Sequence, residues 1–333
     1  MKHIATIILF ALCATKMFAQ NAEVIEIQSL SPPETILNFG TGDKNIAIVA
    51  IHYSQNAKTQ TSEQLFILDS LIVNAIANNI KERLEESPIF ENFDIPVYNL
   101  YSDSAMIGEK MQKEELVAIS EQSGAKIVVA IEFVDIKSNY IIEKDKKPLV
   151  TNVDFNVLIN AYDVETGDNV SEYTRKSNIM IPAFYDDDGT YIAPPQREDA
   201  RRITAETIGR DYARQISPTW ETVERIIFYD SYYDGKNSNF GKGYNSAVNQ
   251  EDWATAADYW TDALVENMTK LKKAQAMYNI AVACEMLEKT DLSLRWLEKA
   301  KDLKTRINDN VVEYENILKQ RIEDKEKLDK VLE

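Results

Sequence analysis

The sequence predicts an α+β protein: a mixed β-sheet flanked by helices, followed by an all-α region of helical repeats. Two observations support this class. Up to residue 216, short apolar runs typical of strands alternate with amphipathic segments typical of helices. Beyond residue 235, strand patterns are absent, and two helical stretches share one spacing of small and large apolar residues.

The composition is that of an acidic globular protein. The chain has 333 residues, of which 44% are hydrophobic and 27% charged, with only 10 glycines and 9 prolines. Collagen-like and low-complexity classes are therefore excluded, and the length favours roughly two domains. The 37 basic and 54 acidic residues give a formal charge of −17. This balance argues against nucleic acid or an anionic lipid surface as the main partner.

The first 19 residues have the pattern of a secretory signal peptide. A basic start is followed by the apolar run Ile4 to Ala14 and by the small residue Ala19, after which cleavage is expected. The run is too short to span a bilayer. The prediction is export across the inner membrane to the periplasm or envelope. The alternative is a lipoprotein acylated at Cys13, although Leu12 is bulky for the position before such a cysteine.

Cleavage after Ala19 leaves Cys284 as the single cysteine, so no intramolecular disulfide is expected. Cys284 lies in an apolar helical stretch and is predicted to be a small buried side chain. No later segment is long and apolar enough to predict a membrane span.

After an N-terminal extension at 20–44, an α/β domain is predicted at 45–216. It opens with the β-branched run NIAIVAI at 45–51, which is typical of a strand buried on both faces. An amphipathic helix at 62–86 ends before Pro88, and a short strand is expected at 95–100.

The second half of this domain continues the alternation. A helix at 113–123 stops at a glycine, and the apolar run 126–136 predicts a central strand. Residues 153–161 and 169–181 alternate with a period of two around a turn, which indicates an antiparallel hairpin with one wet face. A helix at 198–216 closes the domain.

An interdomain segment at 217–235 precedes helical repeats at 236–304 and a capping helix at 305–333. In each repeat a small residue is followed four positions later by a large apolar one and then, three positions on, by alanine. The two copies lie 37 residues apart. Small residues are typical where helices approach closely. The predicted packing residues are Ala256, Trp260 and Ala263 in one copy and Ser293, Leu297 and Ala300 in the other.

These helical units resemble tetratricopeptide repeats, with 274–300 as one repeat and 240–265 as a degenerate one. The period is three residues longer than the usual 34, and the closing proline is missing. The resemblance covers roughly a quarter of the chain. It implies antiparallel helix pairs, with the first helix of each pair lining a groove.

The N-terminal part resembles a cell-envelope α/β domain. The order of NIAIVAI, a long helix, a short strand, a helix ending in SGA, VVAIEFVDI and a hairpin is similar to the amino-terminal module of TolB, to the curli-secretion lipoprotein CsgG and to penicillin-binding-protein activator lipoproteins. Together with ISPTWETVERIIFY and DWATAADYW, it resembles an uncharacterised Bacteroidota envelope family. The resemblance implies fold and compartment rather than an activity.

No catalytic, cofactor or metal residues are predicted. His52, the one histidine after signal cleavage, follows a predicted strand and is interpreted as a surface residue at the strand exit. Zinc motifs are absent, and the acidic loop 186–189 lacks the twelve-residue calcium pattern. The protein is therefore expected not to be an enzyme. The alternatives are a hydrolase of envelope carbohydrate with unidentified carboxylates and a small-ligand binding module.

The favoured function is a non-enzymatic envelope scaffold. The helical repeats are expected to bind an envelope protein or peptide segment, and the α/β domain to dock on an envelope assembly. The register of the repeat places four residues on the predicted groove face of the first helix: Gln275, Tyr278, Val282 and Glu285. Tyr278 is the expected anchor, because tyrosine is enriched at binding hot spots.

Overall fold

The computed structural model describes residues 21–39, 44–54, 60–90, 93–103, 110–142, 148–186, 188–229 and 238–332. The predicted signal peptide, with Cys13, lies outside these residues. The described chain forms two compact units. Of the described residues, the sheet unit contains those within 30–220 and 331–332, and the helical unit contains those within 21–29 and 221–330.

The sheet unit is built on a mixed five-stranded sheet in the order β3-β2-β4-β5-β6. Its strands are β2 (Ile46–Ser54), β3 (Val97–Asp103), β4 (Ile127–Ile142), β5 (Pro148–Asp163) and β6 (Asn169–Pro182). Strand β2 runs parallel to both β3 and β4, whereas β4, β5 and β6 are antiparallel neighbours. The predicted mixed sheet is confirmed, and β4 is longer than its apolar run because it continues as one arm of a long hairpin with β5.

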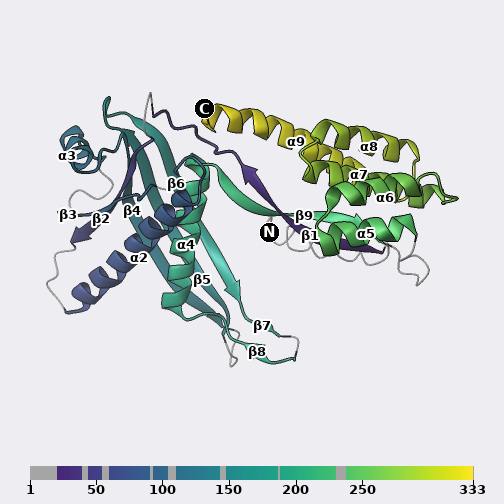
Figure 1. Ribbon diagram of the computed structural model, residues 1–333. Coiled ribbons are helices and arrows are strands. Elements are labelled where there is room, and N and C mark those ends of the chain that lie inside the picture. The colour runs from purple at the N-terminus through teal and green to yellow at the C-terminus, as the bar shows by residue number, and fades with distance from the viewer. Residues whose placement is uncertain are drawn as a thin grey trace. The chain divides into compact units, whose positions relative to one another are not determined.

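Helices cover the sheet unevenly. The helices are α2 (Gln60–Glu85), α3 (Lys113–Ser123) and α4 (Arg197–Ile216). Helices α2 and α4 pack together on one face, where Ile76, Ile80 and Tyr212 belong to the main core (Figure 1). Helix α3 contributes Leu116 and Ile119 to a smaller core on the other face. Two short strands, β7 (Phe184–Tyr185) and β8 (Tyr191–Ile192), which the sequence analysis did not predict, pair beyond β6.

A buried polar cluster surrounds Glu132, which lies where the β4–β5 register shifts between Ile131 and Phe133. The Glu132 carboxylate is fully buried and accepts hydrogen bonds from Asn160 Nδ2 at 2.6 Å, from the Met111 backbone N–H at 3.3 Å and from the Tyr162 hydroxyl. Burial raises the pKa of Glu132, although these hydrogen bonds partly oppose the rise.

The raised pKa of Glu132 predicts a pH dependence of stability. Because the folded-state pKa lies above the unfolded value, the contribution of this group is complete below the unfolded pKa of about 4.3 and is lost as the pH rises through the folded pKa. The free energy of unfolding of the parent should therefore increase, relative to Glu132→Gln, as the pH falls from 7 towards 5. Urea unfolding of both proteins between pH 7 and pH 5 tests this prediction. A difference in the free energy of unfolding that does not change with pH would contradict it.

The helical unit contains five helices in its described part. They are α5 (Asn239–Gln250), α6 (Trp253–Ala263), α7 (Lys270–Met286), α8 (Thr290–Asp302) and α9 (Asn308–Leu332). Adjacent helices pack in antiparallel pairs, α5 with α6 and α7 with α8 (Figure 1). All six predicted packing residues are buried: Ala256, Trp260, Ala263, Ser293, Leu297 and Ala300. The predicted all-helical C-terminal region is confirmed at this level. Among all the described residues, no helix has the length and apolar character to cross a membrane.

Two strands, which the sequence analysis does not predict, also belong largely to the helical unit. Strand β1 (Ala22–Ser31) comes from the N-terminal extension, and β9 (Thr219–Phe228) comes from the segment interpreted as interdomain. They form a two-stranded sheet. Ile25 of β1 and Ile227 of β9 pack into the core of the helices. The helical unit is thus assembled from both ends of the described chain.

Candidate functional site

The predicted groove face of α7 is covered. The exposed fractions of Gln275, Tyr278, Val282 and Glu285 are 5%, 3%, 0% and 4%. Tyr278 lies between two other rings, with Phe228 of β9 at 5.2 Å and Tyr314 of α9 at 5.1 Å between ring centroids. The register placed these residues on one functional face, but the chain's own β9 and α9 occupy that face. These four side chains therefore do not line an open groove.

Strand β9 is fixed to α7 by one side-chain amide. Asn279 accepts a hydrogen bond from the Phe228 backbone N–H at 2.9 Å and donates one to the Phe228 carbonyl at 2.8 Å. The amide of Asn279 thus pairs with the backbone as a neighbouring strand would. Asn279 itself is fully buried. This contact satisfies backbone groups that a two-stranded sheet would otherwise leave open at the side facing α7.

A buried ionic cluster joins β9, α7 and α9. Arg225 binds the Glu285 carboxylate through two hydrogen bonds, Nε to Oε2 and Nη2 to Oε1, both at 2.8 Å. The Tyr314 hydroxyl and the Arg321 guanidinium donate to the same carboxylate. Burial alone would raise the pKa of Glu285, but the hydrogen bond and charge of Arg225 outweigh it and lower this pKa. Glu285 is therefore an ionised group whose carboxylate is fully engaged by residues of the helical unit.

An open pocket lies instead between α5 and α6. Ser238 caps α5 by accepting from the Gly241 N–H at 3.2 Å, and Asp252 caps α6 by accepting from the Thr255 N–H at 3.0 Å. The helices are joined by a two-residue turn in which Glu251 has a φ of +54°. They pack closely because Gly243 has no side chain: a Cβ there would lie 2.6 Å from Trp260 Nε1.

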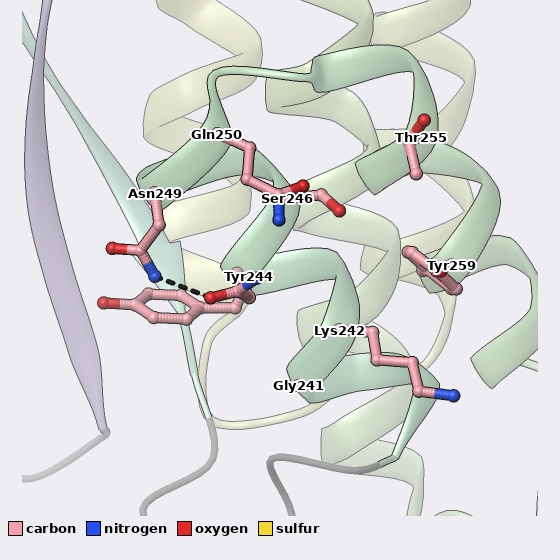
Figure 2. Close-up of a pocket in the computed structure, with 9 residues that line it drawn as sticks. Gly241, Lys242, Tyr244, Ser246, Asn249, Gln250, Thr255 and Tyr259 are labelled. Atoms are coloured by element: carbon pink, nitrogen blue, oxygen red, sulfur yellow. Dashed lines mark hydrogen bonds between the residues drawn. The ribbon is translucent and has the colours of Figure 1, made fainter.

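The pocket has a volume of about 340 Å³. Figure 2 shows its walls, which carry two aromatic rings, side-chain amides, hydroxyls and one lysine. Asn249 Nδ2 donates to Asn245 Oδ1 at 2.8 Å along the α5 wall. The nine lining residues are Gly241, Lys242, Tyr244, Asn245, Ser246, Asn249, Gln250, Thr255 and Tyr259.

The two aromatic residues of the pocket, Tyr244 and Tyr259, have different contacts. The Tyr244 hydroxyl donates to Glu23 of β1, and its ring lies 5.5 Å from that of Tyr229. Burial and the Glu23 carboxylate both raise the pKa of Tyr244, so this hydroxyl stays protonated at neutral pH. Tyr259 is half-buried, and Lys242 Nζ lies 5.8 Å from its ring centroid. Lys242 is the one charged side chain among the described lining residues.

The lining residues of the pocket offer hydrogen-bonding groups and apolar contact area together. Asparagine and glutamine amides both donate and accept hydrogen bonds, as a peptide backbone requires of its partner. Tyrosine rings supply rigid apolar contact area. The sequence contains a signal for this pocket, since Asn245, Asn249 and Gln250 follow one another at helical spacing on α5. That signal is weak because polar residues on a helix most often face water.

His52 is buried, and its interpretation as a surface residue is wrong. It is 2% exposed, its Nε2 lies 2.8 Å from Asn99 Oδ1, and its ring stacks on Tyr101 at 5.1 Å. The cause is its place inside β2, which continues to Ser54. Cys284 is buried as predicted, and burial raises the pKa of its thiol. The described residues contain no group of three or more His, Cys, Asp or Glu side chains placed to hold a metal ion.

The fold and the pocket define a two-unit α+β protein whose helical part carries an open polar pocket. The chain belongs to the family described as Domain of unknown function (DUF8603), which matches residues 43–228, more than half of its length. A second family, Domain of unknown function (DUF6340), matches residues 243–320 and thus includes the pocket.

Among solved structures, the chain is similar to the PelC dodecamer from Paraburkholderia phytofirmans. The identity is 13%, the match covers 58% of this chain and 98% of that one, and the TM-score is 0.25. It is also similar to the hypothetical protein CT253 from Chlamydia trachomatis, with 12% identity, 42% and 74% coverage and a TM-score of 0.23. No curated protein matches the sequence.

Proposed function

We propose that this protein is a non-enzymatic interaction protein of the cell envelope, and that the α5–α6 pocket binds an extended segment of a partner protein. The observation that carries the proposal is the lining of that pocket, in which side-chain amides, hydroxyls and two tyrosine rings surround a volume of about 340 Å³. The helical pairs around it are proposed to be tetratricopeptide-like. In this proposal, the pocket replaces the covered α7 face as the binding site.

The segment bound in the pocket would be recognised mainly through its backbone. Asn245, Asn249 and Gln250 supply donors and acceptors on one wall, and Tyr259 supplies the apolar contact on the other. Lys242 at the rim favours a segment that carries a carboxylate. One pocket of this size buries a short stretch of chain, so a dissociation constant on the order of micromolar or weaker is expected.

The sheet unit carries the second part of the proposal, docking on an envelope assembly. Phe184 and Tyr185 of β7 are 58% and 71% exposed, and Met180 of β6 is 58% exposed. The β7–β8 hairpin is ordered by Asp186 Oδ1, which accepts from the Thr190 N–H at 2.7 Å. Large apolar side chains held exposed on an ordered hairpin favour a protein contact.

Export to the envelope rests on the N-terminal pattern described above. Cleavage after Ala19 would produce a mature chain that begins at Gln20 and carries no lipid. The resemblance to TolB, CsgG and Bacteroidota envelope proteins supports the same compartment. Intact-mass measurement of the protein from its native host tests this part of the proposal. An acylated Cys13 would contradict it and would indicate a membrane-anchored lipoprotein instead.

The pocket is tested with an array of random decamer peptides and the purified full chain. The parent should bind a subset of peptides enriched in Asp or Glu. Tyr259→Ala should weaken the binding of that subset at least about tenfold, because the variant lacks the aromatic wall of the pocket. Binding is measured by fluorescence anisotropy on the selected peptides.

Two matched variants control this experiment. Tyr101→Ala removes a ring in the sheet unit that is 72% exposed and lies outside both proposed contact sites, and it should leave peptide affinity unchanged. Lys242→Gln should abolish the preference for acidic peptides. Lys270→Gln, which removes an exposed lysine outside the pocket, should leave that preference unchanged. The pocket would be excluded as the binding site if Tyr259→Ala and Tyr101→Ala bound the peptides equally well, or if the parent bound no peptide of the array.

A further inference from the structure

Strand β6 forms an open edge of the five-stranded sheet. It is the last strand in the order β3-β2-β4-β5-β6, and it is 14 residues long. Its residues from Thr174 to Asn178 are all exposed. A long exposed edge offers unpaired backbone N–H and C=O groups to another strand.

The outward-facing residues of β6 follow from its hydrogen bonds. The Glu172 carbonyl accepts from Gln215 Nε2 of α4 at 3.1 Å, so Glu172 directs its backbone groups away from β5. Direction alternates along a strand, because each residue points both of its backbone groups to one side. The even-numbered residues, among them Thr174 and Lys176, therefore present their backbone groups to the open edge. The Glu172 carbonyl, which Gln215 already binds, has a second lone pair that can accept from the N–H of a neighbouring strand.

The same even-numbered residues have their side chains on one face of the sheet. Tyr173 and Ile179 pack against the core beneath α2 and α4, so their neighbours in the strand point to the opposite face. Glu172 and Lys176, which carry opposite charges, are both exposed there. They lie at equal distances in sequence from Thr174, one on each side.

We infer that a second copy of this chain pairs with the β6 edge, antiparallel, with the two-fold axis at Thr174. In this register Thr174 faces its own copy, and Glu172 of each protomer lies directly opposite Lys176 of the other. The opposite charges form two symmetric cross-strand pairs. Shifting the axis to Lys176 or to Glu172 would place like charges opposite each other, which is unfavourable.

The helix-facing side of β6 is compatible with this register. Arg175 of one protomer would lie opposite Tyr173 of the other. Within one protomer Arg175 already donates to the Tyr173 hydroxyl at 3.2 Å and pairs with Asp211 at 2.6 Å. Charged residues on edge strands commonly prevent indiscriminate pairing. On β6 the order of the charged residues favours the register centred on Thr174 and disfavours the registers centred on Glu172 or Lys176. The edge is therefore selective for a second copy in one register. The resulting dimer would have a continuous ten-stranded sheet, and it does not depend on the pocket or its ligand.

The register is tested by crosslinking the full chain with a short-armed bismaleimide. Paired residues in an antiparallel ladder have Cα atoms about 5.5 Å apart, so Thr174→Cys should yield a covalent dimer. Asn178→Cys is the matched control. It is equally exposed, but its two copies would lie eight strand positions apart, about 27 Å, and should not crosslink. The parent, whose Cys284 is buried, gives the background.

Sedimentation equilibrium tests the charge pairs separately. Lys176→Glu should raise the dimer dissociation constant at least about tenfold, because it sets two pairs of glutamates opposite each other. The double variant Glu172→Lys with Lys176→Glu restores opposite charges and should restore the dimer. A monomeric parent, equal crosslinking of Thr174→Cys and Asn178→Cys, or no recovery in the double variant would each overturn the inference.

Discussion

Replacing Glu285 by alanine is expected to lower the free energy of unfolding of the helical unit by about 3–5 kcal/mol. The variant leaves the buried Arg225 guanidinium without its carboxylate, and it removes the acceptor of the Tyr314 hydroxyl. An uncompensated buried charge costs far more than the pair itself contributes. Urea unfolding followed by far-ultraviolet circular dichroism measures the loss.

Glu315→Ala is the matched control for this variant. Glu315 is also a glutamate of the helical unit with two cationic partners, Lys301 and Lys319, but those partners are about half exposed. Surface pairs of this kind contribute about 0–1 kcal/mol. The double variant Arg225→Ala with Glu285→Ala should be less destabilised than the sum of its single variants, because no lone charge remains buried. Equal losses for Glu285→Ala and Glu315→Ala would contradict the role assigned to the buried pair.

Gly209→Ala is expected to destabilise the sheet unit by about 1–3 kcal/mol. Gly209 lies where α4 crosses α2, and a Cβ at this position would be 2.7 Å from the Ile76 carbonyl oxygen and 2.8 Å from the Asn79 Cβ. A backbone atom cannot move aside as a flexible side chain can, so the two helices must separate. This cost outweighs the gain in helix propensity of up to about 1 kcal/mol that alanine has over glycine.

Arg210→Ala controls for the position of Gly209 in α4. Arg210 is the next residue along the helix and is exposed, so its truncation should change stability by no more than about 0.5 kcal/mol. Thermal unfolding of the two variants compares them directly. If Gly209→Ala were as stable as the parent, the close packing of α2 against α4 at Gly209 would be contradicted.

Much of the sheet unit could be predicted because its patterns are local. The run Ile46 to Ala50 is apolar throughout and is fully buried. The alternation in β5 places Val153 and Val157 in the core. Such patterns depend on a strand's own residues and not on distant partners.

Strand β9 was missed because its burial depends on residues far away in sequence. It contains an arginine at a buried position, and Arg225 is stable there only because Glu285, 60 residues later, is brought to it. The same contacts cover the α7 face that the repeat register marked as a groove. A register identifies a face of a helix, but it does not identify what packs on that face. The pocket between α5 and α6 was missed because its signal, polar residues at helical spacing on α5, is also what a solvent-exposed helix face shows.

The origin of β1 and β9 bears on how the chain must be assembled. The strand that emerges first during synthesis finds its partner late, since Gln28 of β1 contacts Thr222 of β9, 194 residues further along the chain. The whole sheet unit is thus an insertion between two strands of the helical unit. A fragment that begins at residue 236 would contain every helix of the repeats but would lack β9, and Asn279 and Glu285 would lose the strand that satisfies them. The helical unit is therefore not a detachable C-terminal module, although the order of its helices along the chain suggests one.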